Sequence, residues 1–211
     1  MSRGLGIVVA AALLAACHAP AEDSASAPSA PAASLGAATP AGAATVAASA
    51  QAPAPNGYDE RVVNFGGYGA ARFNDDAAAV RHAVGQPLDA APPPDDPAAC
   101  HYLLSRPRGP DGFGLAFMME GGKFVRYDVD TPAIVAPGGL AVGMRAQDVQ
   151  TAFGTQVDVQ PHKYVDAGEV LVVRPADGGE SRLVFETDGR GIITAWRIGL
   201  EPQVQYVEGC S

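Results

Sequence analysis

The chain has 211 residues and is acidic, with 14 lysines and arginines against 23 aspartates and glutamates and a net charge of −9. Before position 57 the only charged side chains are Arg3, Glu22 and Asp23, so the part from 57 to 211 carries −8. Such a domain repels nucleic acid and anionic lipid, and we expect neither as a partner.

The first residues have the form of a secretory signal. Arg3 supplies a positive charge, and the run from Leu5 to Ala16 is apolar but too short to span a bilayer. The residues Leu-Ala-Ala-Cys at 14–17 resemble the lipobox of bacterial lipoproteins, in which the signal is removed before the cysteine and the cysteine is acylated.

This resemblance implies a lipoprotein signal peptide at 1–16 and a lipid anchor on Cys17. Several acyl chains of the palmitate type bind a membrane stably. The alternative is an ordinary signal peptide with a cysteine there by chance. His18, rather than aspartate, follows the cysteine. By the same resemblance this favours the outer membrane, with the protein lipid-anchored on its periplasmic face.

The segment 17–56 is expected to be a disordered tether. After Cys17 it is made of alanine, proline, serine and threonine with occasional glycine, and it contains no aromatic residue. It cannot bury enough apolar surface to offset the entropy of ordering. Its reach is about 30–40 Å by coil scaling. The part from 57 to 211 is long enough to form one folded domain with a core.

Two stretches of that domain share one pattern. Val80 and Gly85 of the first correspond to Val149 and Gly154 of the second, 69 positions later. Apolar residues three and four apart predict a short helix in each, ended by its glycine. The stretches are NDDAAAVRHAVG at 74–85 and GMRAQDVQTAFG at 143–154.

Each predicted helix is followed by apolar runs that glycine-containing turns separate, a pattern typical of antiparallel hairpins. The runs are 100–104, 113–120 and 124–129 after the first helix, and 169–174, 182–186 and 192–198 after the second. We therefore predict an α+β fold of two tandem helix-plus-antiparallel-meander repeats, at about 67–136 and about 137–211. The helices should pack on one face of an antiparallel sheet.

The last strands of the two halves have matching patterns. By alternation, each should place three residues on one face. These are Val125, Tyr127 and Val129 in the first half, and Thr194, Trp196 and Ile198 in the second.

Part of the second half resembles a known module. Gly143-Met144, Asp148-Val149 and the strand at 183–186 are similar to the Gly-Met helix-and-meander unit of the SmpA/OmlA (BamE) outer-membrane lipoproteins. The β-lactamase inhibitory protein has a similar unit in tandem and binds its enzyme with the sheet face opposite the helices. The resemblance covers about 67–198 and implies a proteobacterial outer-membrane lipoprotein that binds a protein through its sheet.

Two features qualify this resemblance. The first copy has Asn74 and Asp75 where Gly-Met would stand. The segment PHKYV at 161–165 and the ending YVEGCS also resemble a group of small proteobacterial lipoproteins, some of which are labelled lectins. That second resemblance implies carbohydrate or peptidoglycan binding instead.

Once Cys17 is lipidated, Cys100 and Cys210 remain as an even pair. In an oxidising compartment such a pair predicts a disulfide bond. In the chain-entropy model, closing a loop of about 110 residues contributes on the order of 4–5 kcal/mol. The alternative is a reactive free thiol.

No catalytic arrangement stands out. The only serines of the domain are Ser105, Ser181 and Ser211, and no Gly-x-Ser-x-Gly elbow surrounds them. Paired carboxylates for glycoside hydrolysis stay open as an alternative, but none lies in a stretch apolar enough to raise a pKa. We expect the protein not to be an enzyme.

No metal or cofactor is expected either. The four histidines are isolated in sequence. Asp128 and Asp130 share one face of a strand, where a calcium ion could bind, but a solvated face is the simpler interpretation. The glycine-rich stretch at 66–69 lacks the Lys-Ser/Thr of a phosphate loop.

Aromatic and cationic side chains in or beside the second meander are the candidate ligand-binding residues. On an open sheet face they could form a protein hot spot or stack on sugars. For Trp196, and for Tyr127 at the matching position, we favour the alternative that both rings face the helices as core. The candidates are His162, Lys163, Tyr164, Trp196, Arg197 and Tyr206.

The expected function is therefore a non-catalytic cell-envelope binding lipoprotein that recognises a protein partner through its sheet face. The alternative is a lectin-like lipoprotein that binds carbohydrate or peptidoglycan.

Overall fold

The computed structural model describes residues 57–108 and 112–210. The predicted signal peptide at 1–16, the lipidated Cys17 and the tether at 17–56 lie outside the described residues. No helix within the described ranges is long and apolar enough to cross a membrane.

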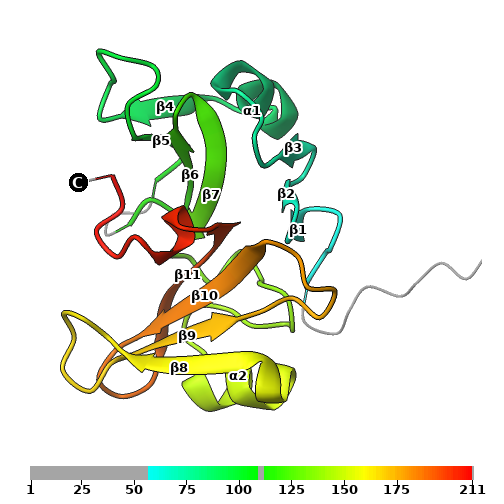
Figure 1. The fold of residues 1–211 in the computed structure, drawn as a ribbon, viewed down its shortest axis with the longest axis vertical. Helices are drawn as coiled ribbons and strands as arrows, with labels where there is room; N and C mark the ends of the chain where they lie inside the picture. Colours follow the sequence, from blue (N-terminus) through cyan, green and yellow to red (C-terminus); the bar gives the residue numbers. More distant parts are fainter. Residues whose placement is uncertain (1–56, 109–111, 211) are drawn as a thin grey trace, which may run out of the picture. The chain divides into compact units, whose positions relative to one another are not determined.

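The fold combines strands and helices and consists mostly of antiparallel sheet, which agrees with the predicted α+β class (Figure 1). Eight antiparallel strands form one sheet in the order β4-β5-β6-β7-β11-β10-β9-β8. Their bounds are β4 Leu88–Ala91, β5 His101–Ser105, β6 Leu115–Glu120, β7 Lys123–Val129, β8 Val157–Pro161, β9 Glu169–Val173, β10 Ser181–Thr187 and β11 Ile193–Leu200.

A second, small sheet precedes the first helix. It consists of β1 (Val63–Asn64), β2 (Gly67–Tyr68) and β3 (Ala71–Arg72), paired antiparallel. Strands of two residues leave no periodic pattern in the sequence, and for that reason they were not predicted.

The two α-helices form where the sequence pattern predicted them. Helix α1 spans Ala77–Val84, and the Asp76 side chain caps it by accepting the Ala79 N–H at 2.8 Å. Helix α2 spans Ala146–Phe153, and one turn of 3-10 helix, η1 (Gly154–Gln156), follows it. Each α-helix buries one valine completely, Val80 or Val149.

Each helix is followed by four strands rather than the three predicted. The additional strands are β4 and β8, which lie at the two edges of the sheet. Because an edge strand buries little, its side chains need no alternating apolar pattern. All residues of β8 after Val157 are exposed, which explains why this strand was missed.

The main core lies between one face of the large sheet and a layer made of α1, α2 and β1–β3 (Figure 1). Its largest members are aromatic, and Tyr127 and Trp196 meet edge to face with ring centroids 6.0 Å apart. The prediction that these two rings belong to the core is confirmed.

A β-bulge changes the predicted face of both last strands. The pairing of β6 with β7 skips Val125, so that Phe124 joins Tyr127 in the core. The pairing of β10 with β11 skips Thr194 in the same way, and Ile193 takes the core position. The prediction that Val125 and Thr194 share a face with the core residues was therefore wrong, because alternation fails across a bulge.

Main-chain contacts at the entry to the two helices also correspond. Asn74 N–H donates to the Phe124 carbonyl, and Phe124 N–H donates to the Asp75 carbonyl, both at 2.8 Å. In the second half the same pattern joins 143 and 144 to 193, at 2.9 and 2.8 Å. Asn74 and Gly143 both have positive φ, at 75° and 94°.

Candidate functional site

The second face of the large sheet is partly covered by the end of the chain. Residues Glu201–Cys210, here called the strap, include the 3-10 helix η2 (Gln203–Gln205), which lies against β7, β10 and β11. Val204 is fully buried there and forms a small cluster with three valines of β9 and β10. The sheet face on which we predicted binding is therefore not open at its centre.

Two buried arginines hold the strap by its main chain. Arg126 of β7 donates from Nη1 to the carbonyls of Gln203 and Tyr206, both at 2.8 Å. Arg197 of β11 donates from Nε to the carbonyl of Val204 at 2.6 Å. Hydrogen bonds from a charged donor are among the stronger ones in proteins, so this part of the strap is firmly docked.

Arg126 is itself paired below the strap. Its Nε and Nη2 contact the two carboxylate oxygens of Asp128 at 2.9 and 2.8 Å, and Nη2 also donates to Tyr102 Oη at 2.7 Å. Burial raises the pKa of Asp128, while Arg126 opposes that rise. Burial likewise raises the pKa of Tyr102. The expectation of a solvated Asp128 was wrong, because the strap covers this face.

A second ion pair lies beside the first. Arg197 donates from Nη1 to Glu186 Oε1, and His162 Nε2 lies 3.7 Å from Glu186 Oε2. His162 Nδ1 accepts the main-chain N–H groups of Tyr164 and Val165 at 3.1 and 3.2 Å. Because Nδ1 is an acceptor, the proton of the neutral ring is on Nε2, which faces Glu186.

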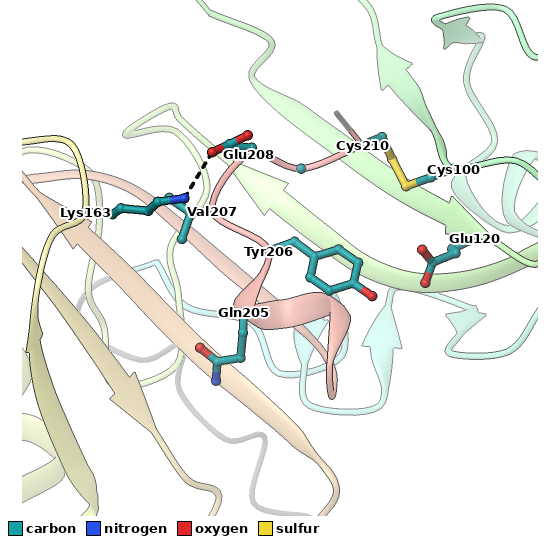
Figure 2. A pocket seen from close by; sticks show the side chains of 9 residues that line it. Cys100, Glu120, Lys163, Gln205, Tyr206, Val207, Glu208 and Cys210 are labelled. Carbon is teal, nitrogen blue, oxygen red and sulfur yellow. Dashed lines mark hydrogen bonds and ion pairs between the residues drawn. A yellow bond between two sulfur atoms is a disulfide. The ribbon is translucent and has the colours of Figure 1, made fainter.

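The loop after β8 meets the strap at the surface. Lys163 Nζ lies 3.2 Å from Glu208 Oε1, and the Tyr164 hydroxyl donates to the same oxygen. Tyr164 is 57% exposed, and Val165 and Val207 are 36% and 37% exposed. Figure 2 shows the ion pair from Lys163 to Glu208 with Val207 beside it. We call these five residues, 163–165 with 207 and 208, the strap surface.

Pockets open on both sides of the strap. One, of about 480 Å³, has among its lining residues Cys100, Glu120 and Tyr206 together with three residues of the strap surface, Lys163, Val207 and Glu208 (Figure 2). The other, of about 260 Å³, contains Tyr102, Arg197 and Glu186 among its lining residues. We call the second the arginine pocket. Residues Val207–Gly209 line both, so they separate the two pockets.

The predicted disulfide bond joins Cys100 to Cys210, 110 positions apart, and the prediction is confirmed. It ties the far end of the strap to the residue before β5. Gly209 packs so closely on Tyr102 that a Cβ there would lie 2.6 Å from the hydroxyl oxygen. The strap thus has a docked beginning and a covalently fixed end.

Five of the six predicted binding residues gather at this place. His162, Lys163 and Tyr164 lie beside the strap, Tyr206 is part of it, and Arg197 lies beneath it. Trp196 is the exception and is corrected here. Its side chain belongs to the core on the opposite face and is 1% exposed, so the ring cannot present itself at the surface.

Five residues of this site were not predicted from the sequence: Tyr102, Arg126, Asp128, Glu186 and Glu208. Arg126 and Asp128 lie on the strand face opposite Tyr127, and by alternation alone that face looks solvated. Cys210 was the one available signal, since a disulfide at the chain end requires that end to cross the domain.

The alternative calcium site finds no support at Asp130. Its carboxylate accepts the N–H groups of Phe113 and Gly114 at 2.9 and 2.6 Å. Among the described residues, no group of three or more His, Cys, Asp or Glu side chains could hold a metal ion.

Ser181, one of the serines considered as a nucleophile, makes a structural contact. Its hydroxyl donates to the Phe65 carbonyl at 2.8 Å and so connects β10 to the turn between β1 and β2.

No protein-family model matches the chain, and no curated protein matches it. Three solved structures are similar at 9–14% sequence identity. The uncharacterized protein yfeY from Escherichia coli is 12% identical, with a TM-score of 0.45, over 66% of this chain and 99% of its own.

The other two similarities are weaker. An extracellular protein containing a SCP domain from Bacillus anthracis str. Ames is 9% identical over 61% of this chain, with a TM-score of 0.40. The match covers 44% of that chain, so this protein spans less than half of its length. A DUF4309 family protein (YjgB) from Bacillus subtilis subsp. subtilis str. 168 is 14% identical over 60% of this chain and 79% of its own, with a TM-score of 0.33.

Proposed function

We propose that this chain is a non-catalytic lipoprotein of the cell envelope that binds a protein partner through the strap surface. The observation that carries the proposal is the exposed group of Tyr164, Val165 and Val207, which the Cys210 disulfide and the Glu208 contacts hold in place. An exposed aromatic ring between apolar and charged neighbours is typical of a binding hot spot. Preorganisation of the surface lowers the entropy lost on binding.

The position of this surface changes the original hypothesis. We expected the strands themselves to meet the partner, but the strap covers the centre of that face. The partner therefore contacts the strap and the loop 162–165, while the strands below serve as their support.

Two observations support a location in the cell envelope. The disulfide is a bond that persists in oxidising compartments. The N-terminal sequence resembles a lipoprotein signal followed by Cys17, which supports anchoring to the periplasmic face of the outer membrane. Replacement of the anchor, Cys17→Ser, should release the protein into the soluble fraction; unchanged membrane fractionation would refute the anchor.

We also infer that the domain is a tandem repeat of the Gly-Met helix-and-meander module. Both α-helices, both bulges and both pairs of entry hydrogen bonds recur 69 positions apart. Asn74 differs from the glycine of the Gly-Met motif in residue type but not in the sign of its φ angle. Its positive φ is one that glycine adopts freely and asparagine tolerates better than most residues.

The test is photo-crosslinking in the native envelope, with a photoreactive residue at Val165, which is 36% exposed, followed by capture with three variants. Val207→Ser and Tyr164→Ala should each reduce capture of the crosslinked protein at least about fivefold, which corresponds to losing about 1 kcal/mol. Val62→Ser is the matched control. Val62 is 38% exposed, like Val207, and it directly precedes β1, outside the strap surface. Equal capture by all three variants would contradict the proposal.

Carbohydrate or peptidoglycan binding is the second candidate. Tyr164 favours it, since a ring that is 57% exposed can stack on a sugar. Retention of the protein on peptidoglycan or glycan columns, with no protein crosslink, would favour this candidate over the first.

A further inference from the structure

The arginine pocket contains hydrogen-bonding groups that the protein itself does not use. Arg197 is 4% exposed, and its Nε and Nη1 are engaged by Val204 and Glu186. Its Nη2 has no hydrogen-bond partner in residues 57–108 and 112–210. Arg126 differs, because each of its three nitrogens has a partner. Among the described residues only Trp196 Nε1 is a fully buried polar atom without a partner, so Arg197 Nη2 opens on the pocket, where water or a ligand group can accept from it.

An unused acceptor lines the same pocket. Glu186 Oε1 is taken by Arg197, but Oε2 is 3.7 Å from His162 Nε2, which is too long for a hydrogen bond. The Tyr102 oxygen accepts from Arg126, and its own hydrogen has no acceptor among the described side chains and main chain. The pocket therefore offers two donors and one acceptor.

Charge decides which ligand these groups suit. Arg126 is paired with Asp128, Arg197 with Glu186, and Glu208 with Lys163 just outside the pocket. Every charged side chain of the wall is therefore paired. Either a carboxylate or an ammonium group in the pocket would lose its hydration and would meet like and opposite charges together, with little net attraction. In a site of low dielectric, either encounter is unfavourable. A neutral group that carries both an acceptor and a donor is the better match.

Size and the remaining walls narrow the choice. At about 260 Å³ the pocket is below the usual range for a whole small molecule, roughly 300–1,000 Å³. Leu104, Phe113 and Ala195 supply an apolar wall against which a short methylene chain can pack. The two arginines already bind three main-chain carbonyls of the strap. Amide oxygens are thus acceptors that both arginines bind, beside the carboxylates with which each is paired.

We propose that the arginine pocket receives an asparagine or glutamine side chain of the protein partner. The carboxamide oxygen accepts from Arg197, and its NH₂ group donates to Glu186. Val207 and Glu208 line this pocket and also belong to the strap surface, so one partner can cover both. The inference rests on the proposed function and adds the chemistry of the group that anchors the partner.

The test uses the ¹⁵N-labelled full-length protein with its disulfide intact. The probes are N-acetyl-glutamine N-methylamide, the corresponding glutamate derivative, and methyl glucoside. The glutamine probe should shift the main-chain amide signals of Ala195, Val207 and Gly209, with a dissociation constant on the order of millimolar, as its small size implies. The glutamate probe should bind at least about tenfold more weakly.

Two variants locate the binding. Ala195→Leu places a larger side chain on the strand face that Arg197 shares, and it should abolish the shifts. Ala78→Leu on the exposed side of α1 is the matched control and should leave them unchanged. If Ala195→Leu perturbs the spectrum globally, Ala195→Val replaces it, because valine adds less volume on the same strand face.

Several results would overturn the inference: no shifts with the glutamine probe, equal or tighter binding of glutamate, or shifts with methyl glucoside alone. If Tyr164→Ala loses the crosslinked partner while Ala195→Leu captures it normally, the pocket assignment is wrong and the proposed function stands. If the glutamine probe binds in the pocket but no crosslink depends on Tyr164 or Val207, the proposed function is wrong and the pocket assignment stands.

Discussion

Removal of the disulfide by the double substitution Cys100→Ser and Cys210→Ser should release only the far end of the strap. In the unfolded chain, the bond closes a loop of 110 positions, and losing that constraint costs about 4–5 kcal/mol in the chain-entropy model. The folded state also relaxes, because residues 207–210 regain about 1–2 kcal/mol of main-chain entropy each.

The interactions that residues 207–210 make with the rest of the protein are weak, apart from the disulfide. Glu208 pairs with Lys163 and accepts from the Tyr164 hydroxyl, and all three side chains are more than half exposed. Exposed contacts of this kind contribute about 0–1 kcal/mol each. Relaxation therefore offsets part of the lost constraint. We expect the free energy of unfolding to fall by no more than about 3 kcal/mol, rather than by the full loop value.

The beginning of the strap should stay docked. Three hydrogen bonds from Arg126 and Arg197 contribute about 1.5–3 kcal/mol each, and burial of Val204 adds a similar amount. These terms exceed the entropy of keeping 203–206 ordered, about 1–2 kcal/mol per residue. The strap thus separates into a fixed part and a releasable part.

Equilibrium denaturation gives the change in stability, and hydrogen exchange gives its location. The amides of Gln205 and Tyr206, which donate to Pro202 and Gln203, should keep their protection, while Gly209 loses its protection. Loss of protection at all three amides, or a fall in stability above about 5 kcal/mol, would refute the division of the strap into two parts. The wild-type protein under reducing conditions is the control and should behave like the variant.

Two further predictions concern the buried ion pair and the entry to α2. Arg126→Met should lower the free energy of unfolding by about 3–5 kcal/mol at neutral pH, because Asp128 is left buried without its partner. Burial already raises the pKa of Asp128, and removing Arg126 raises it further, so the folded variant holds a proton that the unfolded chain releases near pH 4. Denaturation should therefore show the variant losing stability as pH rises above about 4; a loss independent of pH between 4 and 8 would contradict this reasoning. Gly143→Asn should be tolerated better than Gly143→Val by about 1–2 kcal/mol, since Gly143 has a φ of 94° and its counterpart Asn74 one of 75°. Equal melting temperatures for the two variants would remove the conformational argument for equivalence of the two positions.

Local sequence was sufficient where local physics decides the outcome. The helices at 77–84 and 146–153 follow from apolar spacing and from a glycine at each end. The disulfide followed from an even pair of cysteines. Pairing in a meander followed from apolar runs between glycine turns, and β5, β6, β7, β9, β10 and β11 all form within or beside the predicted runs.

The edges of the sheet and the fine register could not be predicted in this way. The edge strand β8 is mostly exposed, so it needs no apolar alternation. A bulge moves one residue out of the ladder, and nothing in the side chains of Val125 or Thr194 announces it. Only the packing of Phe124 and Ile193 into the core selects those registers.

The pattern of residues along the chain is enough to specify the α+β class, the two helices, the aromatic core with Tyr127 and Trp196, and the bond that closes the chain end. Tertiary packing decides that Arg126, Asp128 and Arg197 are buried, because their strand face would be solvated without the strap. It also decides that Tyr164 and Val207 share one surface although 43 positions separate them. The reason is physical: burial of a polar strand face depends on what crosses it, and a segment distant in sequence leaves no periodic signal there.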